Sequence, residues 1–98
     1  MPTFVLLSKV SREGVRRIKN LAQMDREFDA RLREHCPEVR RLASYALLGA
    51  YDFLHIFEAP DAKTAAQVAL LANSFGVSTT QTLTAIPFDE FMELVEKI

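Results

Sequence analysis

A histidine interrupts one of the most apolar segments of the chain. His55 lies in the run from Tyr51 to Phe57, whose other residues are bulky and apolar except for Asp52. An imidazole in a partly dry cavity can serve as a general base or hold a ligand, because its charge changes near neutral pH. The structural alternative is a hydrogen-bonded histidine in the core or at its rim. His55 is therefore the first candidate for a functional group.

Two tyrosines and a glutamine would add polar groups to the same cavity. Tyr51 and Tyr45 carry hydroxyls on apolar rings, so each is either a brace within the core or an anchor for a ligand. Gln81 and Thr79 share one face of a Thr-rich segment, which is either a cavity wall or an ordinary solvated edge strand. We expect the following residues to line the candidate cavity: His55, Tyr51, Tyr45, Gln81 and Phe53.

A short hairpin precedes this segment. Gly49 can take the positive φ that tight turns often require. Asp52 can accept hydrogen bonds from backbone donors of the turn and so fix the strand register. The alternative is that Asp52 contacts a ligand at the mouth of the cavity. We favour the structural role for both Gly49 and Asp52.

Several kinds of chemistry lack the residues they need. Cys36 adjoins His35, but neighbouring side chains on a helix diverge by about 100° around its axis, so a Cys–His nucleophile pair is poorly supported. Two histidines and one cysteine give no metal-ligand spacing. The chain also lacks a phosphate-binding loop, a dinucleotide glycine pattern and a serine nucleophile elbow. We expect neither a metal nor another cofactor.

The composition is that of an ordinary globular domain. Hydrophobic residues make up 49% of the chain and charged residues 26%. We expect one domain over residues 1–98, with a single core. The apolar runs are far shorter than the ~20 residues of a membrane span, and the first residues do not read as a signal peptide. Together with the lone cysteine, these features predict a cytoplasmic protein with no membrane partner.

Basic residues are concentrated in the first part of the chain. Residues 1–41 hold ten Lys and Arg against six Asp and Glu, whereas residues 42–98 hold two against seven. The basic residues are mixed with acids at helical spacing, which is typical of a solvated helix face, and we expect no nucleic-acid partner. Three pairs stand in the favourable i,i+4 order: Glu13 with Arg17, Glu27 with Arg31, and Asp29 with Arg33.

Hydrophobic periodicity predicts an α+β fold with the order β-α-β-β-α-β and a C-terminal helix. This order is typical of ferredoxin-like folds, in which two helices cover one face of a four-stranded antiparallel sheet. In the second strand, Arg41 and Tyr45 share one parity. The expected elements are a strand over Thr3–Val10, a helix from Ser11 to about Cys36, strands over Glu38–Leu48 and Tyr51–Phe57, a helix over Ala62–Phe75, a strand over Val77–Ile86, and a helix after Pro87.

The third strand has bulky apolar residues on both of its faces. Tyr51, Phe53 and Phe57 share one parity, and Leu54 and Ile56 share the other. The helices cover only one face of the sheet, so the other would expose a large apolar surface. Two sheets packed face to face would cover it. We therefore expect a homodimer that forms a dimeric α+β barrel, with further association left open.

The sequence resembles the GYD domain family over nearly its whole length. The resemblance rests on Gly49-x-Tyr51-Asp52 followed by Glu58-Ala59-Pro60-Asp61, on the opening Met1-Pro2-Thr3-Phe4-Val5, on Gly14-x-x-x-Ile18-Lys19, and on Thr79-Thr80-x-Thr82. It implies a ferredoxin-like domain of the dimeric α+β barrel kind, with no reaction assigned. The hairpin is also similar to one in the small-molecule-sensing domains of leucine-responsive regulators.

Three functions are compatible with this pattern. The leading one is a binding module: a homodimeric barrel that holds a small, partly apolar ligand between its subunits. The second is a cofactor-independent enzyme that uses His55 and a tyrosine hydroxyl for proton transfer. The third is a structural or assembly protein with a filled interior. The sequence identifies neither a ligand nor a reaction.

Overall fold

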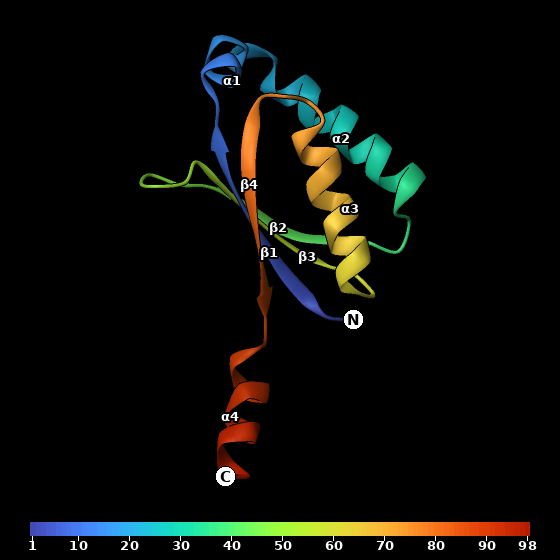
Figure 1. The fold of residues 1–98 in the computed structure, drawn as a ribbon, viewed down its shortest axis with the longest axis vertical. Coiled ribbons are helices and arrows are strands. Elements are labelled where there is room, and N and C mark those ends of the chain that lie inside the picture. The colour runs from blue at the N-terminus through green and yellow to red at the C-terminus, as the bar shows by residue number, and fades with distance from the viewer.

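The computed structural model describes residues 1–98 and consists of two layers with a projecting helix (Figure 1). A four-stranded antiparallel sheet in the order β2-β3-β1-β4 forms one layer, and α2 and α3 cover one of its faces. In chain order the elements are β1 Thr3–Val10, α1 Arg12–Arg16, the 3-10 turn η1 Ile18–Asn20, α2 Leu21–His35, β2 Arg40–Ala46, β3 Phe53–Glu58, α3 Ala62–Asn73, β4 Ser78–Ala85 and α4 Phe88–Glu96.

This architecture confirms the predicted α+β fold. The ferredoxin-like order β-α-β-β-α-β, the antiparallel sheet and the C-terminal helix are all present. Side chains cap the first turns of two helices. The Ser11 hydroxyl accepts from the backbone N–H of Gly14 at 3.1 Å, and the Asp61 carboxylate accepts from that of Thr64 at 2.8 Å.

The first predicted helix is divided into three parts. Arg17, at φ −105° and ψ 19°, leaves the helical conformation and ends α1, and η1 then leads into α2. Gly14 holds α1 tightly against the start of β4, because a Cβ atom there would lie 2.2 Å from the carbonyl oxygen of Val77. The same oxygen accepts a hydrogen bond from the Ser11 N–H at 2.8 Å. The chain must therefore turn before α2 can run along the sheet.

The core lies between the sheet and the helices. Phe4 and Leu6 of β1 and Phe57 of β3 are buried there, and the Phe4 and Phe57 rings stack with their centroids 5.6 Å apart. Cys36 and Leu32 close the core from the end of α2. The β1–β3 register places Leu6 opposite His55 and Ser8 opposite Phe53, so these side chains also face the helices.

Tyr51 does not lie on the face of Phe53 and Phe57, contrary to the sequence prediction. The third strand begins at Phe53 rather than Tyr51, and a bend precedes it. Asp52 causes this bend: its N–H donates to the Ser8 carbonyl at 2.8 Å, and its carboxylate accepts from the Val10 N–H at 2.7 Å. The bend interrupts the alternation of side chains and directs Tyr51 to the opposite face.

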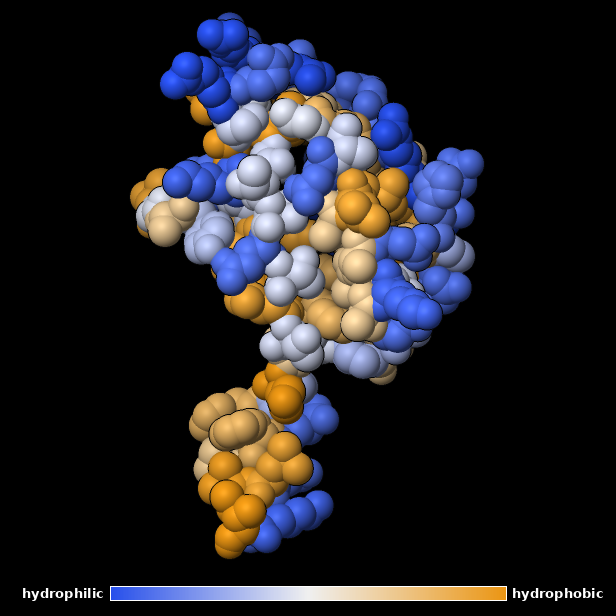
Figure 2. Space-filling view, viewed as in Figure 1, coloured by the Kyte–Doolittle hydropathy of each residue, from blue (hydrophilic) through white to orange (hydrophobic).

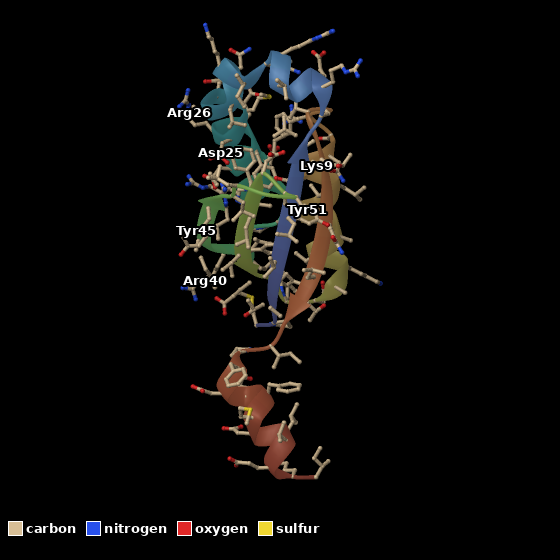
Figure 3. All side chains as sticks on the ribbon, turned by 90° about the vertical axis from the view of Figure 1, so that its left-hand side faces the viewer. Lys9, Asp25, Arg26, Arg40, Tyr45 and Tyr51 are labelled. Atoms are coloured by element: carbon tan, nitrogen blue, oxygen red, sulfur yellow. The ribbon has the colours of Figure 1, made fainter.

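The second face of the sheet carries no helix, and we call it the open face. Figure 3 looks onto it, with Tyr45, Tyr51 and Lys9 labelled. Leu54 and Ile56 lie on it, opposite to Phe53 and Phe57, as predicted from parity. By strand register, its apolar residues are Val5, Leu7, Ala43, Tyr45, Leu54, Ile56, Leu83 and Ala85.

The chain exposes more surface than a compact protein of its size. Its accessible surface is 6896 Å², whereas a folded monomer of 11.1 kDa has about 5,700 Å². Its radius of gyration is 14.8 Å, against about 13 Å for a compact chain of this length. Only 11 of 98 residues are buried. Much of the excess comes from α4, which projects away from the sheet (Figure 1).

The contacts of Asp52 give a stability prediction. Asp52→Ala leaves the Val10 N–H without its carboxylate partner, and we expect the free energy of unfolding to fall by about 1–3 kcal/mol. Asp52→Asn is the matched control, because its amide oxygen can still accept that bond. Urea unfolding followed by circular dichroism measures both variants. Equal losses in the two variants would show that this hydrogen bond does not hold the hairpin.

Candidate functional site

A cavity of about 110 Å³ lies between the sheet and the helices, inside the single chain. Of its 21 lining residues, 14 are hydrophobic, so its walls favour apolar groups. Leu6, Phe53 and Phe57 form its floor on the sheet, and Met24 and Phe28 of α2 lie above it. Polar groups enter the lining at only a few places, among them His55, Arg41 and Asp25.

His55 is the ionisable group on the sheet side of this cavity. Its Nδ1 lies 2.8 Å from the Ser44 hydroxyl on β2, the residue directly opposite in the strand pairing. Loss of water on burial lowers the pKa of His55, the positive charge of Arg41 lowers it further, and Asp25 acts weakly in the opposite direction. The ring is therefore held neutral at pH 7. No hydrogen bond engages its other nitrogen, Nε2, which remains available for a ligand.

Arg41 joins the cavity wall to α2. Its guanidinium lies 3.2 Å from the Asp25 carboxylate and 3.5 Å from that of Asp29, and it stacks over the Phe28 ring at 5.5 Å. The Arg41 side chain is only 23% exposed, so most of it is shielded by these partners. Because two carboxylates already neutralise its charge, Arg41 does not offer a free anion site.

A β-bulge places Arg41 on the cavity side. The pairing of β2 with β3 shifts between Arg41 and Ala43, so Leu42 is an extra residue. A bulge reverses the alternation of side chains beyond it. Arg41 therefore faces the helices, whereas Tyr45 lies on the open face, contrary to the parity that the sequence suggested. Arg41, Asp25 and Ser44 were not predicted as site residues; the available signal was the pair Arg40-Arg41 at the start of the second strand.

Of the five residues predicted to line a cavity between subunits, Tyr45, Tyr51 and Gln81 lie on the open face, whereas His55 and Phe53 lie on the helix side. The Tyr51 hydroxyl donates to Oε1 of Gln81, which pairs with Leu7 of β1 in the strand register. Tyr45 is 59% exposed on the same face (Figure 3). The structure therefore brings together His55 with Phe53 at the internal cavity, and Tyr51 with Gln81 across the open face, and separates the two groups by the thickness of the sheet.

This separation bears on proton transfer. A histidine and a tyrosine hydroxyl must lie within hydrogen-bond reach of one substrate to share a reaction. His55 faces the helices, and both tyrosines face the other way. The partner of His55 is the Ser44 hydroxyl. The pair required by the enzyme hypothesis is therefore not assembled within one chain.

Other reactive groups are isolated from this site. Cys36 is buried at the end of α2, its thiol lies 3.7 Å from Oε1 of Gln67, and burial together with the negative charge of Glu38 raises its pKa. Nowhere in the chain do three or more His, Cys, Asp or Glu side chains form a group that could hold a metal ion. Its helices are too short or too polar to cross a lipid bilayer.

The sequence profile described as "GYD domain" matches residues 4–95. The chain belongs to the GYD domain family. This confirms the resemblance seen in the sequence. A relative from Thermus thermophilus, described as "Glutamine synthetase and cystathionine beta-lyase binding protein", is 40% identical over 87 residues, which cover 89% of this GYD chain and 90% of the relative.

A solved structure shares the fold of this GYD domain. The structure described as "crystal structure of FFRP-DM1" superposes with a TM-score of 0.58 and 20% sequence identity, over 88% of this chain and all of the other. At this identity the likeness concerns the fold alone.

The lowered pKa of His55 predicts how stability depends on pH. The unfolded chain binds a proton at His55 more readily than the folded protein, so the free energy of unfolding falls as the pH drops below about 6.5 and is at its full value above it. His55→Asn should reduce this slope while keeping an acceptor for Ser44. Urea unfolding between pH 7.5 and about 5 measures it.

His35→Asn is the control, because His35 lies exposed at the end of α2. We expect this variant to keep the slope of the wild-type protein. An unchanged slope in His55→Asn would show that His55 is not the group responsible.

Proposed function

We propose that this protein is a homodimeric binding protein that docks on other proteins and so carries or regulates them. The observation that carries the proposal is the Thermus thermophilus relative, whose description names two enzymes that it binds and which aligns over most of both chains. By this likeness, the partner class is a metabolic enzyme of the kind those two represent. The separation of His55 from the tyrosine hydroxyls favours a binding role over a catalytic one.

The homodimer is supported by the open face. Eight apolar residues lie on a sheet surface that no helix covers, and Leu83 and Tyr45 among them are 41% and 59% exposed. The chain exposes roughly 1,200 Å² more than a compact monomer of its mass. Two sheets packed face to face would bury much of the open face and form the dimeric α+β barrel.

A small, partly apolar ligand is a second candidate function, and the internal cavity favours it. The volume of about 110 Å³ is somewhat smaller than a cavity known to accept benzene, about 150 Å³. Phe53 supplies an apolar wall, and Nε2 of His55 offers one hydrogen bond. Between two facing sheets, Tyr51, Gln81 and Tyr45 would instead line the subunit interface, where a ligand shared by both subunits would contact them. If side chains move to fill this cavity, no ligand can enter it, and the assembly role becomes the remaining alternative.

The open face gives a prediction about association. Leu83→Lys places a charge on that face, and we expect it to convert a dimer into a folded monomer, because burying an unpaired ammonium is costly. Leu70→Lys is the matched control: Leu70 is 69% exposed on α3, on the other side of the molecule. Sedimentation equilibrium and circular dichroism measure assembly and folding. A monomeric wild-type protein would refute the homodimer.

The partner class gives a second prediction. We expect the purified protein to bind glutamine synthetase or cystathionine beta-lyase from its own source, with a stoichiometry set by the dimer. Isothermal titration calorimetry with each enzyme measures the affinity, and an unrelated enzyme of similar charge serves as the control. Failure to bind either enzyme would contradict the protein-binding role suggested by the relative. The ligand role would then be the remaining candidate, and titration of the protein with small apolar ligands would test it.

A further inference from the structure

Helix α4 carries a complete apolar face that nothing in the chain covers. It contains no buried residue, and Phe88 and Leu94 are 73% and 53% exposed. Figure 2 shows these apolar side chains gathered on the projecting helix, away from the body of the protein. The apolar residues recur at helical spacing: Phe88, Phe91, Met92 and Val95.

An uncovered α4 would be a poor helix by itself. Isolated helices shorter than about 12 residues are marginal in water, and α4 has nine. Its other face is strongly acidic, and none of its acids forms an ion pair: Asp89, Glu90, Glu93 and Glu96. A surface that covers α4 must therefore offer both apolar and basic groups.

A surface with these two properties lies at the other end of the same chain. The segment Arg12–Asn20, which contains α1 and η1, exposes Val15 at 61% and Ile18 at 48%. It also carries four basic side chains against one acid, and its basic groups form no ion pair: Arg12, Arg16, Arg17 and Lys19. The two segments have the same number of residues, nine, and opposite charge.

The two surfaces cannot meet within one subunit. Figure 1 shows α1 and α4 at opposite ends of the long axis of the molecule, which measures 50 Å. Only Ile86 and Pro87 link β4 to α4, and two residues reach at most about 7 Å. The eight residues of β1 alone separate the two ends by about 26 Å.

We propose that α4 docks on the α1–η1 segment of a second copy of this chain, so that each subunit of the dimer clasps the other. The proposal rests on the homodimer proposed above and adds a second contact to it. It requires the two-fold axis to run between the sheets and across the strands, because only then does the α4 end of one subunit meet the α1 end of the other. Phe88, Phe91 and Val95 then cover Val15 and Ile18, and the acids of α4 face the arginines.

Charge reversal tests this pairing. One variant carries Glu90→Lys and Glu93→Lys on α4, and a second carries Arg16→Glu and Arg17→Glu on α1; all four side chains are exposed. We expect each variant alone to raise the dimer dissociation constant about tenfold at low salt, because like charges then face each other. Glu27→Lys with Glu34→Lys, two exposed positions on α2, is the matched control and should leave the constant unchanged.

Mixing the two variants distinguishes a contact between subunits from any other effect of charge. In a mixed dimer, the introduced lysines on α4 of one subunit meet the introduced glutamates on α1 of the other, and the second α4–α1 pair keeps its wild-type charges. We expect the mixture to form heterodimers about as tightly as the wild-type protein, by sedimentation equilibrium, with circular dichroism confirming that both variants fold.

Each remaining outcome counts against a definite claim. A wild-type dimer that neither variant weakens would overturn the clasp and leave the sheet-to-sheet dimer standing. Two weakened variants that do not rescue each other would overturn the assignment of α1–η1 as the docking surface. A monomeric wild-type protein would refute the homodimer and the clasp together.

Discussion

Two long helices have to cover a four-stranded sheet, and right-handed crossovers place both of them on the same face. One side of the sheet therefore becomes a core of stacked phenylalanines and aliphatic residues, and the other stays uncovered. The open face follows from this one constraint, and the projecting α4 adds further exposed surface. The uncovered apolar face, which a second protein surface could cover, is a direct result of how the strands and helices are connected.

The polar groups on the two sides of the sheet make different contacts. On the helix side, Arg41 links β2 to α2 through Asp25 and Asp29, and Ser44 orients His55 across the β2–β3 pair. Their charges and hydrogen bonds are largely satisfied within the chain, which leaves a mostly apolar cavity with one available nitrogen. On the open side, Tyr51 and Gln81 join each other across β1 and leave the surrounding surface apolar. Such a surface suits contact with protein better than it suits catalysis.

Much of the fold could be read from the sequence, because the signals are local. The helix caps at Ser11 and Asp61, the helical period of α2 and α3, and the order of the elements need only neighbouring residues to be recognised. The candidate site was harder to predict, because it depends on which face of the sheet each strand residue points to. One extra residue at Leu42 and one bend at Asp52 are enough to reverse the faces of Tyr45 and Tyr51. The bend is fixed by Ser8 and Val10, which are far away in the sequence.

The sequence alone therefore determined the fold class, the family and the presence of apolar residues on both sides of the third strand, since side-chain type and spacing encode each of these. Only the tertiary structure decided which candidate residues share a surface: His55 and Phe53 at an internal cavity, and Tyr45, Tyr51 and Gln81 on the open face. The physical reason is that side chains alternate every residue along a strand, so a single irregularity changes the face of every residue beyond it. Hydrogen bonds between distant strands, and not local preference, fix where those irregularities occur.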